Sequence, residues 1–305
     1  MQFDDTTPLL SFDDELCFKL RRMSAATLYA LAAIALWGTL ASLGASLSHL
    51  PPFLLTGLAL MIGSVMSWPA VLRNRKAWAV PPRTLALGIY GLFGFHFLLF
   101  IALRHAPPVE ANLVNYLWPL FMVVLAPVLL PGLSLRPLHM VAALLGFAGA
   151  AIAILGARNA GPATTDATYW GFLPALGSAF IWASYSLWTK RVAGFPTAAI
   201  GLFGLVSGVL ALVCHALLEP QASLTASDWL LVSLCGLGPL GAAFFLWDMA
   251  LKRGDARQIG ILSYITPLAS TALLMVVTQR PLSWTIALAA FLILSAAVMG
   301  SRVRA

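Results

Sequence analysis

Long apolar runs separated by short breaks rich in proline or charge make up most of this 305-residue chain. A helix needs about 20 mainly apolar residues to cross the ~30 Å hydrocarbon core of a bilayer. Runs of that length predict ten membrane-spanning helices. They cover about residues 25–47, 53–72, 84–103, 109–130, 138–157, 169–189, 197–218, 229–250, 258–278 and 284–301. The sequence therefore predicts an all-α polytopic membrane protein.

Composition supports this interpretation. Hydrophobic residues make up 60% of the chain and charged residues 10%, whereas soluble domains have about 45–50% and about 25%. These values exclude a soluble enzyme, a disordered chain and a disulfide scaffold. Cys17, Cys214 and Cys235 fit no metal-binding spacing, so we expect small buried side chains in the apolar runs and no metal or other cofactor.

The positions of Lys and Arg predict the orientation. If the N-terminus is cytoplasmic, every one of the 18 basic residues except Arg104, Arg158 and Arg280 lies on the cytoplasmic side. Cytoplasmic loops of membrane proteins carry such an excess. Both termini are therefore expected in the cytoplasm, and the net charge of +7 needs no nucleic-acid partner.

An internal repeat relates the two halves of the chain. The segment Asn112-Leu113-Val114-Asn115-Tyr116-Leu117-Trp118-Pro119-Leu120 matches Gly260-Ile261-Leu262-Ser263-Tyr264-Ile265-Thr266-Pro267-Leu268, 148 residues later. Upstream, Trp37 matches Trp182. We therefore divide the chain into a cytoplasmic tail (1–24), a first five-helix half (25–157), a linker (158–168) and a second half (169–302). An odd number of spans per half inverts the second copy, an arrangement found in secondary transporters.

The acidic tail has none of the features of a cleavable signal peptide. It is either a short disordered segment or an upstream addition, if translation begins at Met23.

Together, these features resemble the drug/metabolite transporter superfamily, with two EamA-type halves over about residues 25–302. The resemblance rests on the five-plus-five arrangement, on the Trp37-Gly38 pair and on the Asn-Tyr-x-x-Pro-Leu element with its second copy. Within the superfamily it is most similar to bacterial aromatic amino acid exporters, through Asn115-Tyr116-Leu117-Trp118-Pro119. The resemblance implies a multi-pass inner-membrane transporter that exports Trp, Phe or Tyr by alternating access.

Polar and aromatic side chains within the spans are the candidate substrate contacts, because burying them in lipid is costly without a reason. On the fourth span, spacings of three and four residues predict that Asn112, Asn115, Tyr116 and Pro119 share one helix face. Pro119 is expected to bend the helix and to free the carbonyl of Asn115. His96 lies mid-span and binds either substrate or a neighbouring helix. The candidate set is Trp37, His96, Asn112, Asn115, Tyr116, Trp118, Pro119, Trp182, Tyr185, Ser186, Ser263, Tyr264 and Pro267.

Other residues receive structural interpretations. Trp68, Trp78, Trp170, Trp229 and Trp284 are expected at the membrane interface. Tyr90 and Trp188 are expected to pack between helices, and Gly204-x-x-x-Gly208 and Ala142-x-x-x-Gly146 to mark close helix contacts.

Embedded carboxylates are lacking, and this bears on energy coupling. No Asp or Glu lies at the centre of a predicted span. Asp248 is expected to pair with Lys252 one turn away. We therefore expect facilitated diffusion of an amino acid. Proton coupling through His96, or another amino acid, metabolite or drug as cargo, is the alternative. The sequence contains no motif of a membrane-embedded enzyme. A nucleotide-sugar transporter would be expected to have Lys or Arg deep in a span to bind phosphate, and the basic residues here lie in loops or at helix ends. Two complete halves form the central site without a partner, so we expect a monomer.

Overall fold

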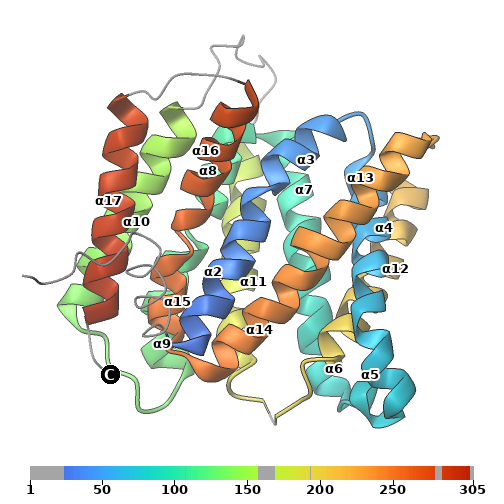
Figure 1. Ribbon diagram of the computed structural model, residues 1–305, viewed down its shortest axis with the longest axis horizontal. Coiled ribbons are helices and arrows are strands. Elements are labelled where there is room, and N and C mark those ends of the chain that lie inside the picture. Colours follow the sequence, from blue (N-terminus) through green and yellow to red (C-terminus); the bar gives the residue numbers. More distant parts are fainter. Residues whose placement is uncertain (1–23, 107, 157–168, 193, 279–283, 303–305) are drawn as a thin grey trace, which may run out of the picture.

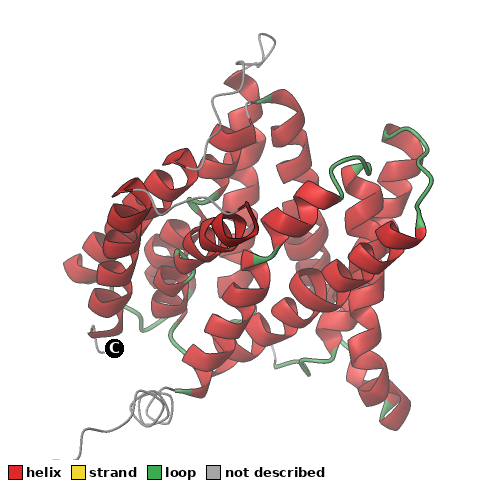
Figure 2. Cartoon of the chain, turned by 45° about the horizontal axis from the view of Figure 1, so that its top comes forward, coloured by secondary structure: helices red, strands yellow, loops and turns green. Residues whose placement is uncertain are grey.

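The computed structural model describes residues 24–106, 108–156, 169–192, 194–278 and 284–302, which form helices joined by short loops (Figures 1 and 2). No strand occurs in these ranges. The all-helical prediction is confirmed.

The helices follow the apolar runs. In the first part they are α2 (Ala25–Gly38), α3 (Leu40–Ser46), α4 (Pro52–Ser64), η1 (Val65–Ser67), α5 (Trp68–Arg73), η2 (Arg75–Trp78), α6 (Pro82–Ile89), η3 (Tyr90–Gly94), α7 (Phe95–His105), α8 (Pro108–Asn115), α9 (Trp118–Leu129) and α10 (Pro137–Gly156). In the second part they are η4 (Tyr169–Gly171), α11 (Phe172–Trp188), α12 (Ala199–Leu218), α13 (Ala226–Leu237), η5 (Gly238–Ala242), α14 (Ala243–Arg253), α15 (Ala256–Leu262), α16 (Ile265–Thr278) and α17 (Trp284–Arg302).

Local sequence sets several helix starts. Pro52 and Pro82 stand in the first turn of α4 and α6, where the missing N–H removes no intrahelical bond. Thr225 and Asp228 form a reciprocal capping box at α13, which satisfies two otherwise free backbone donors. These signals fix the breaks between apolar runs.

Several helical segments, most of them made of two or more successive helices, are long and apolar enough to cross a bilayer. Six such segments occur in the described ranges: Ala25–Ser46, Pro52–Arg73, Pro82–His105, Ala111–Leu129, Ala199–Leu218 and Ala226–Arg253. Long exposed apolar side chains such as Leu72, Leu173 and Leu217 fit a surface that faces lipid.

Helices of the first part pack mainly against helices of the second. In Figure 1, α10 and α17 lie side by side at one edge, and α4 and α12 lie near the other. Between them, α2 packs against α14, and α11 packs against α7 and α9. The core is therefore formed between the two parts of the chain.

Glycine allows the closest of these crossings. A Cβ on Gly208 would lie 2.8 Å from the carbonyl oxygen of Gly57, and one on Gly57 would lie 3.0 Å from the carbonyl oxygen of Gly208. A Cβ on Gly146 would lie 2.4 Å from the ring of Tyr264. The prediction that the Gly204–Gly208 and Ala142–Gly146 pairs mark close contacts is confirmed.

Two predicted spans are interrupted rather than continuous. The fourth is divided at Tyr116–Leu117 into α8 and α9, and the ninth is divided at Ser263–Tyr264 into α15 and α16. The interruption in the fourth span lies where Pro119 was expected to free the carbonyl oxygen of Asn115, and Leu117 keeps a helical conformation at φ −71° and ψ −12°. The physical reason is that proline has no N–H to donate and its ring clashes with the preceding turn, so the regular hydrogen bonding of α8 ends before Pro119, which stands in the first turn of α9.

Two π-turns occupy matching positions in the two parts. Both η3, at Tyr90–Gly94, and η5, at Gly238–Ala242, are π-helical, and their bounds differ by the 148 residues of the sequence repeat. The helices that follow, α7 and α14, have the same length of 11 residues. Isolated π-turns inside helices occur frequently at functional sites.

Candidate functional site

Aromatic rings from helices of both parts meet at the centre of the molecule. The ring of Trp182 on α11 lies 5.8 Å from that of Trp37 on α2 and 6.4 Å from that of Trp118 on α9. Its other ring contacts are with Phe95, Tyr185, Phe244 and Trp247. We call these seven residues and His96 the aromatic cluster. Its edge-to-face and tilted contacts are the geometries that aromatic pairs prefer.

The indole N–H groups of the cluster differ in their partners. Trp37 Nε1 donates to the carbonyl oxygen of Pro239 in η5 at 3.1 Å, and Trp247 Nε1 donates to Ser186 Oγ at 3.1 Å. Among the described residues, the indole N–H groups of Trp118 and Trp182 have no hydrogen-bond partner. Trp37 and Trp247 are thus fixed by the protein, whereas Trp118 and Trp182 can donate to a bound molecule.

His96 lies at the edge of the cluster on α7 and is buried. Its Nδ1 is 2.6 Å from the carbonyl oxygen of Leu92, and its ring contacts Phe95 and Phe244. A carbonyl oxygen only accepts, so Nδ1 carries the proton. In the neutral ring, Nε2 is then an acceptor.

The first helix break places its residues unequally. Asn115, the last residue of α8, is buried and accepts from Ser178 Oγ at 2.8 Å. Trp118, just after the break, enters the cluster, and Pro119 is buried beside it. Asn112 and Tyr116 are half-buried. Just before the break, Asn115 ties α8 to α11. Just after it, Trp118 connects α9 to the aromatic cluster.

The second break does not bring its residues to the cluster. Ser263 Oγ donates to the carbonyl oxygens of Gly260 and Ile259 on its own helix, at 2.6 and 3.1 Å. Tyr264 is fully buried and packs with Phe147 and Ala150 of α10. Pro267 is buried on α16. Their side chains serve packing in this conformation.

The remaining aromatic residues have the expected structural roles. Tyr90 and Trp188 contact each other, with 5.8 Å between ring centroids. Trp68, Trp170, Trp229 and Trp284 are exposed, as interfacial residues should be. Trp78 differs, because it is half-buried and donates to the carbonyl oxygen of Ala198.

Sequence reasoning missed three members of the cluster: Phe95, Phe244 and Trp247. Their signal was present, because Phe95 precedes His96, and Phe244 and Trp247 lie one turn apart on the eighth span. The predicted ion pair of Asp248 with Lys252, adjacent to Trp247, is confirmed at 2.6 Å.

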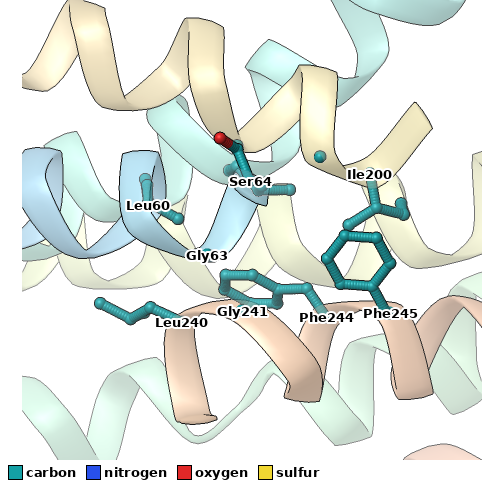
Figure 3. A pocket seen from close by; sticks show the side chains of 11 residues that line it. Leu60, Gly63, Ser64, Ile200, Leu240, Gly241, Phe244 and Phe245 are labelled. Carbon is teal, nitrogen blue, oxygen red and sulfur yellow. The ribbon is translucent and has the colours of Figure 1, made fainter. Parts of the chain in front are cut away.

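A small cavity adjoins the cluster behind Phe244. It has a volume of about 10 Å³, room for about one water molecule. Its walls come from α4, η3, α12, η5 and α14, and Figure 3 shows Ser64 and Gly241 among them. The space beside the cluster is thus too small for an amino acid.

Charged groups gather at the helix ends rather than in the cluster. Arg257 pairs with Asp255 at 2.5 Å and donates to the carbonyl oxygen of Ser134, also at 2.5 Å. Burial opposes ionisation of Asp255, but hydrogen bonds and charge from Arg257 outweigh it and hold the pKa of that carboxyl below its usual range. Within the described ranges, no group of His, Cys, Asp or Glu residues could hold a metal ion.

Comparison with known proteins identifies the family of this chain. The model of the EamA-like transporter family matches residues 24–155 and again 169–302. The chain belongs to the EamA-like transporter family. With several membrane-crossing helices, this transporter is a multi-pass protein of the bacterial inner membrane.

Three curated relatives of this family member share one name. A protein of Ancylobacter novellus named aromatic amino acid exporter YddG is 42% identical over 91% of this chain and 97% of its own length. Proteins of the same name from Salmonella typhimurium and Escherichia coli are 30% and 29% identical, each over 85% of this chain and 91% of its own length. A solved crystal structure that is 40% identical superposes with a TM-score of 0.84, covering 91% of this chain and 98% of its own.

Proposed function

We propose that this EamA-like transporter exports aromatic amino acids across the inner membrane by alternating access. The observation that carries the proposal is the buried aromatic cluster, in a chain 42% identical to a named aromatic amino acid exporter over nearly its whole length. A flat ring fits among indoles, and such ring pairs contribute about 0.5–1.5 kcal/mol beyond burial. On binding, the aromatic ring of the substrate thus replaces contacts that the rings of the cluster otherwise make with one another.

The polar ends of the substrate find partners at the edge of the cluster. The indole N–H groups of Trp118 and Trp182, which lack a protein partner within the described ranges, donate to the α-carboxylate. Neutral His96 accepts through Nε2 from the ammonium group, because its Nδ1 is committed to Leu92. The freed backbone around Asn115 and Tyr116 lies nearby and, as at other interrupted spans, contributes carbonyl oxygens.

The proposed architecture has ten spans in two inverted halves, with both termini in the cytoplasm. The matching π-turns support it. The paired packing supports it as well, since α2 against α14 mirrors α11 against α7. Each pair joins the first span of one half to the third span of the other. Alternating access follows if the halves rock about this arrangement, and a monomer contains the whole site.

Transport is proposed to be facilitative. In the described ranges the cluster contains no carboxylate, and Asp248 is already paired with Lys252 and Thr197. A relay through His96 would require its ring to exchange protons between the two sides of the membrane, which is the alternative.

Uptake into liposomes tests the proposal. Purified protein is given labelled phenylalanine or tryptophan, with threonine and a nucleotide sugar for comparison, with and without a pH gradient. We expect aromatic-selective uptake that the gradient does not concentrate. Transport of another cargo only would overturn the substrate assignment, and concentrative uptake abolished by an uncoupler would overturn the facilitative mechanism.

A matched pair of variants tests the site. Trp182→Phe removes an unpartnered N–H, whereas Trp229→Phe alters an exposed ring at the surface. We expect aromatic uptake to fall about tenfold in the first, the value of one hydrogen bond to a charged group, and to stay unchanged in the second. Equal uptake by both would remove Trp182 from the site.

A further inference from the structure

A buried carboxylate fastens three helices at one end of the molecule. The Glu219 side chain, at the end of α12, is fully buried. It accepts from the backbone N–H groups of Phe53 and Leu54 at the start of α4, at 3.1 and 3.3 Å. Arg104 Nη2 at the end of α7 donates to it at 2.6 Å, and His215 Nδ1 lies 3.0 Å away. We call this group the Glu219 latch.

A second group fastens helices at the opposite end. Asp248 on α14 is buried and accepts from Lys252 Nζ and from Thr197 Oγ1, both at 2.6 Å. Lys252 also donates to the carbonyl oxygen of Phe195, just before α12, at 2.9 Å. We call this group the Asp248 latch. In Figure 1, α12 leads into α13 near the top, whereas α14 ends near the bottom.

The two latches correspond within the repeat. Arg104 and Lys252 are 148 residues apart, and each stands in the last turn of the helix that follows a π-turn. Each cation also lies over a phenylalanine ring, Arg104 over Phe53 at 5.8 Å and Lys252 over Phe195 at 4.2 Å. One latch joins α7 to the start of α4, and the other joins α14 to the segment before α12.

The helices on the two sides of each latch differ in how firmly they are held. At their crossing, α4 and α12 approach closely at Gly57 and Gly208, where a Cβ on either glycine would lie within 3.0 Å of the carbonyl oxygen of the other. At the Glu219 latch, α7 meets this pair through rings, Phe97 and Phe100 on Phe53, and through one ion pair. Opening is therefore expected to move α7 or α14 relative to the crossing of α4 and α12.

The chemistry of the Glu219 latch makes it reversible. If Arg104 leaves, Glu219 keeps its two backbone donors and His215, so it is not left as an unpaired buried charge, which would be costly. The side chain of Arg104 is 39% exposed, so water hydrates the guanidinium readily. At the other end Lys252 is 29% exposed, and Thr197 stays on Asp248.

We propose that these latches are the two gates of the transporter, with Glu219 and Arg104 holding the extracellular side closed and Asp248 and Lys252 the cytoplasmic side. The assignment of sides rests on the proposed function and its cytoplasmic termini. Both latches are closed in this structure, in agreement with the packed aromatic cluster. Each opens in turn, and the four residues are positioning residues that act through helix movement rather than by touching substrate.

Spin-label distances test the gates without any cargo. In a background lacking Cys17, Cys214 and Cys235, one label pair at 170 and 217 reports the Glu219 end. Position 170 is on η4, which packs against α7, and position 217 is at the end of α12. A second pair at 72 and 253 reports the Asp248 end, since Leu72 is on α5 and Arg253 ends α14. Arg104→Gln and Lys252→Gln are compared with the charge-conserving Arg104→Lys and Lys252→Arg.

We expect Arg104→Gln to raise the long-distance population of the first pair about fivefold, the shift that loss of one partly exposed ion pair produces. The second pair should not change. Lys252→Gln should show the converse, and both charge-conserving variants should match the parent. Glu219→Gln, which keeps an acceptor oxygen for the α4 amides, should repeat the effect of Arg104→Gln.

Unchanged distances in both Gln variants, or equal changes at both ends in each, would overturn the gates. Loss of thermal stability without a change in distance would assign the latches a structural role only and would also overturn the proposal. If distances respond while liposomes take up no aromatic amino acid, the gates stand and the proposed cargo fails. If uptake of aromatic amino acids occurs and distances do not respond, the proposed cargo stands and the gates fail.

Discussion

The helix breaks at Tyr116–Leu117 and at Ser263–Tyr264 descend from one repeated segment yet lie in different surroundings. After the first break, Trp118 enters the aromatic cluster, and its counterpart 148 residues later is the buried Thr266. At the first break Tyr116 is half-buried, whereas its counterpart Tyr264 is fully buried against α10. The repeat preserves the backbone interruption, while the side chains bring one break into the aromatic cluster and make the other a packing joint.

The largest expected effect concerns the packing joint. Gly146→Ala places a methyl group 2.4 Å from the Tyr264 ring, and overpacking of this kind costs about 2 kcal/mol. We expect a loss of that size in chemical unfolding measured in detergent. Gly44→Ala is the control, because a Cβ there meets nothing within 4 Å. Equal stability of the two variants would mean that Tyr264 moves aside easily.

The second prediction contrasts the two breaks in transport. Trp118→Phe removes an unpartnered indole N–H from the cluster and should lower aromatic uptake about tenfold, equivalent to about 1.4 kcal/mol. Tyr264→Phe keeps the buried ring and should leave uptake unchanged. Liposome uptake at matched protein content measures both. A larger loss in Tyr264→Phe would exchange the roles assigned to the two breaks.

The third prediction concerns how the first break is held. Ser178→Ala removes the 2.8 Å hydrogen bond to Asn115 and should cost about 1 kcal/mol in unfolding free energy. Ser233→Ala is matched to it, because that exposed hydroxyl bonds only to the carbonyl oxygen of Trp229. Similar values for the two would show that the tie between α8 and α11 contributes nothing.

The smallest effect is expected at Ser263. Its hydroxyl bonds to carbonyl oxygens of its own helix, so Ser263→Ala should change unfolding free energy by less than about 0.5 kcal/mol. Uptake should also stay within experimental error. A clear loss of transport with normal stability would place the second break in contact with substrate.

The sequence was sufficient for the helical class and for the approximate position of both breaks. Apolar runs determine where helices lie in a membrane protein, and Pro119 and Pro267 marked the places where a helix could not continue. The π-turns were not predicted, because Tyr90–Gly94 and Gly238–Ala242 are as apolar as their flanks. Their glycines and Pro239 weaken a helix locally but do not specify a π-turn.

Members of the aromatic cluster were predicted only where they carried a local signal. Trp118 and Trp182 stood out through the repeat, and His96 through its polarity. The gates were missed because Glu219 lies 166 residues from its partner Phe53 along the chain. A contact of that separation depends on how the two parts pack, which no local pattern encodes.

The interleaving of the two parts also bears on biogenesis. The closest helix partners, α4 with α12 and α10 with α17, become available to each other only late in synthesis. Until α17 has been synthesised and inserted, the face of α10 that later contacts α17 is exposed to lipid. Helices of the first half must therefore stay in the bilayer without their main partners until the helices of the second half, α17 among them, are inserted.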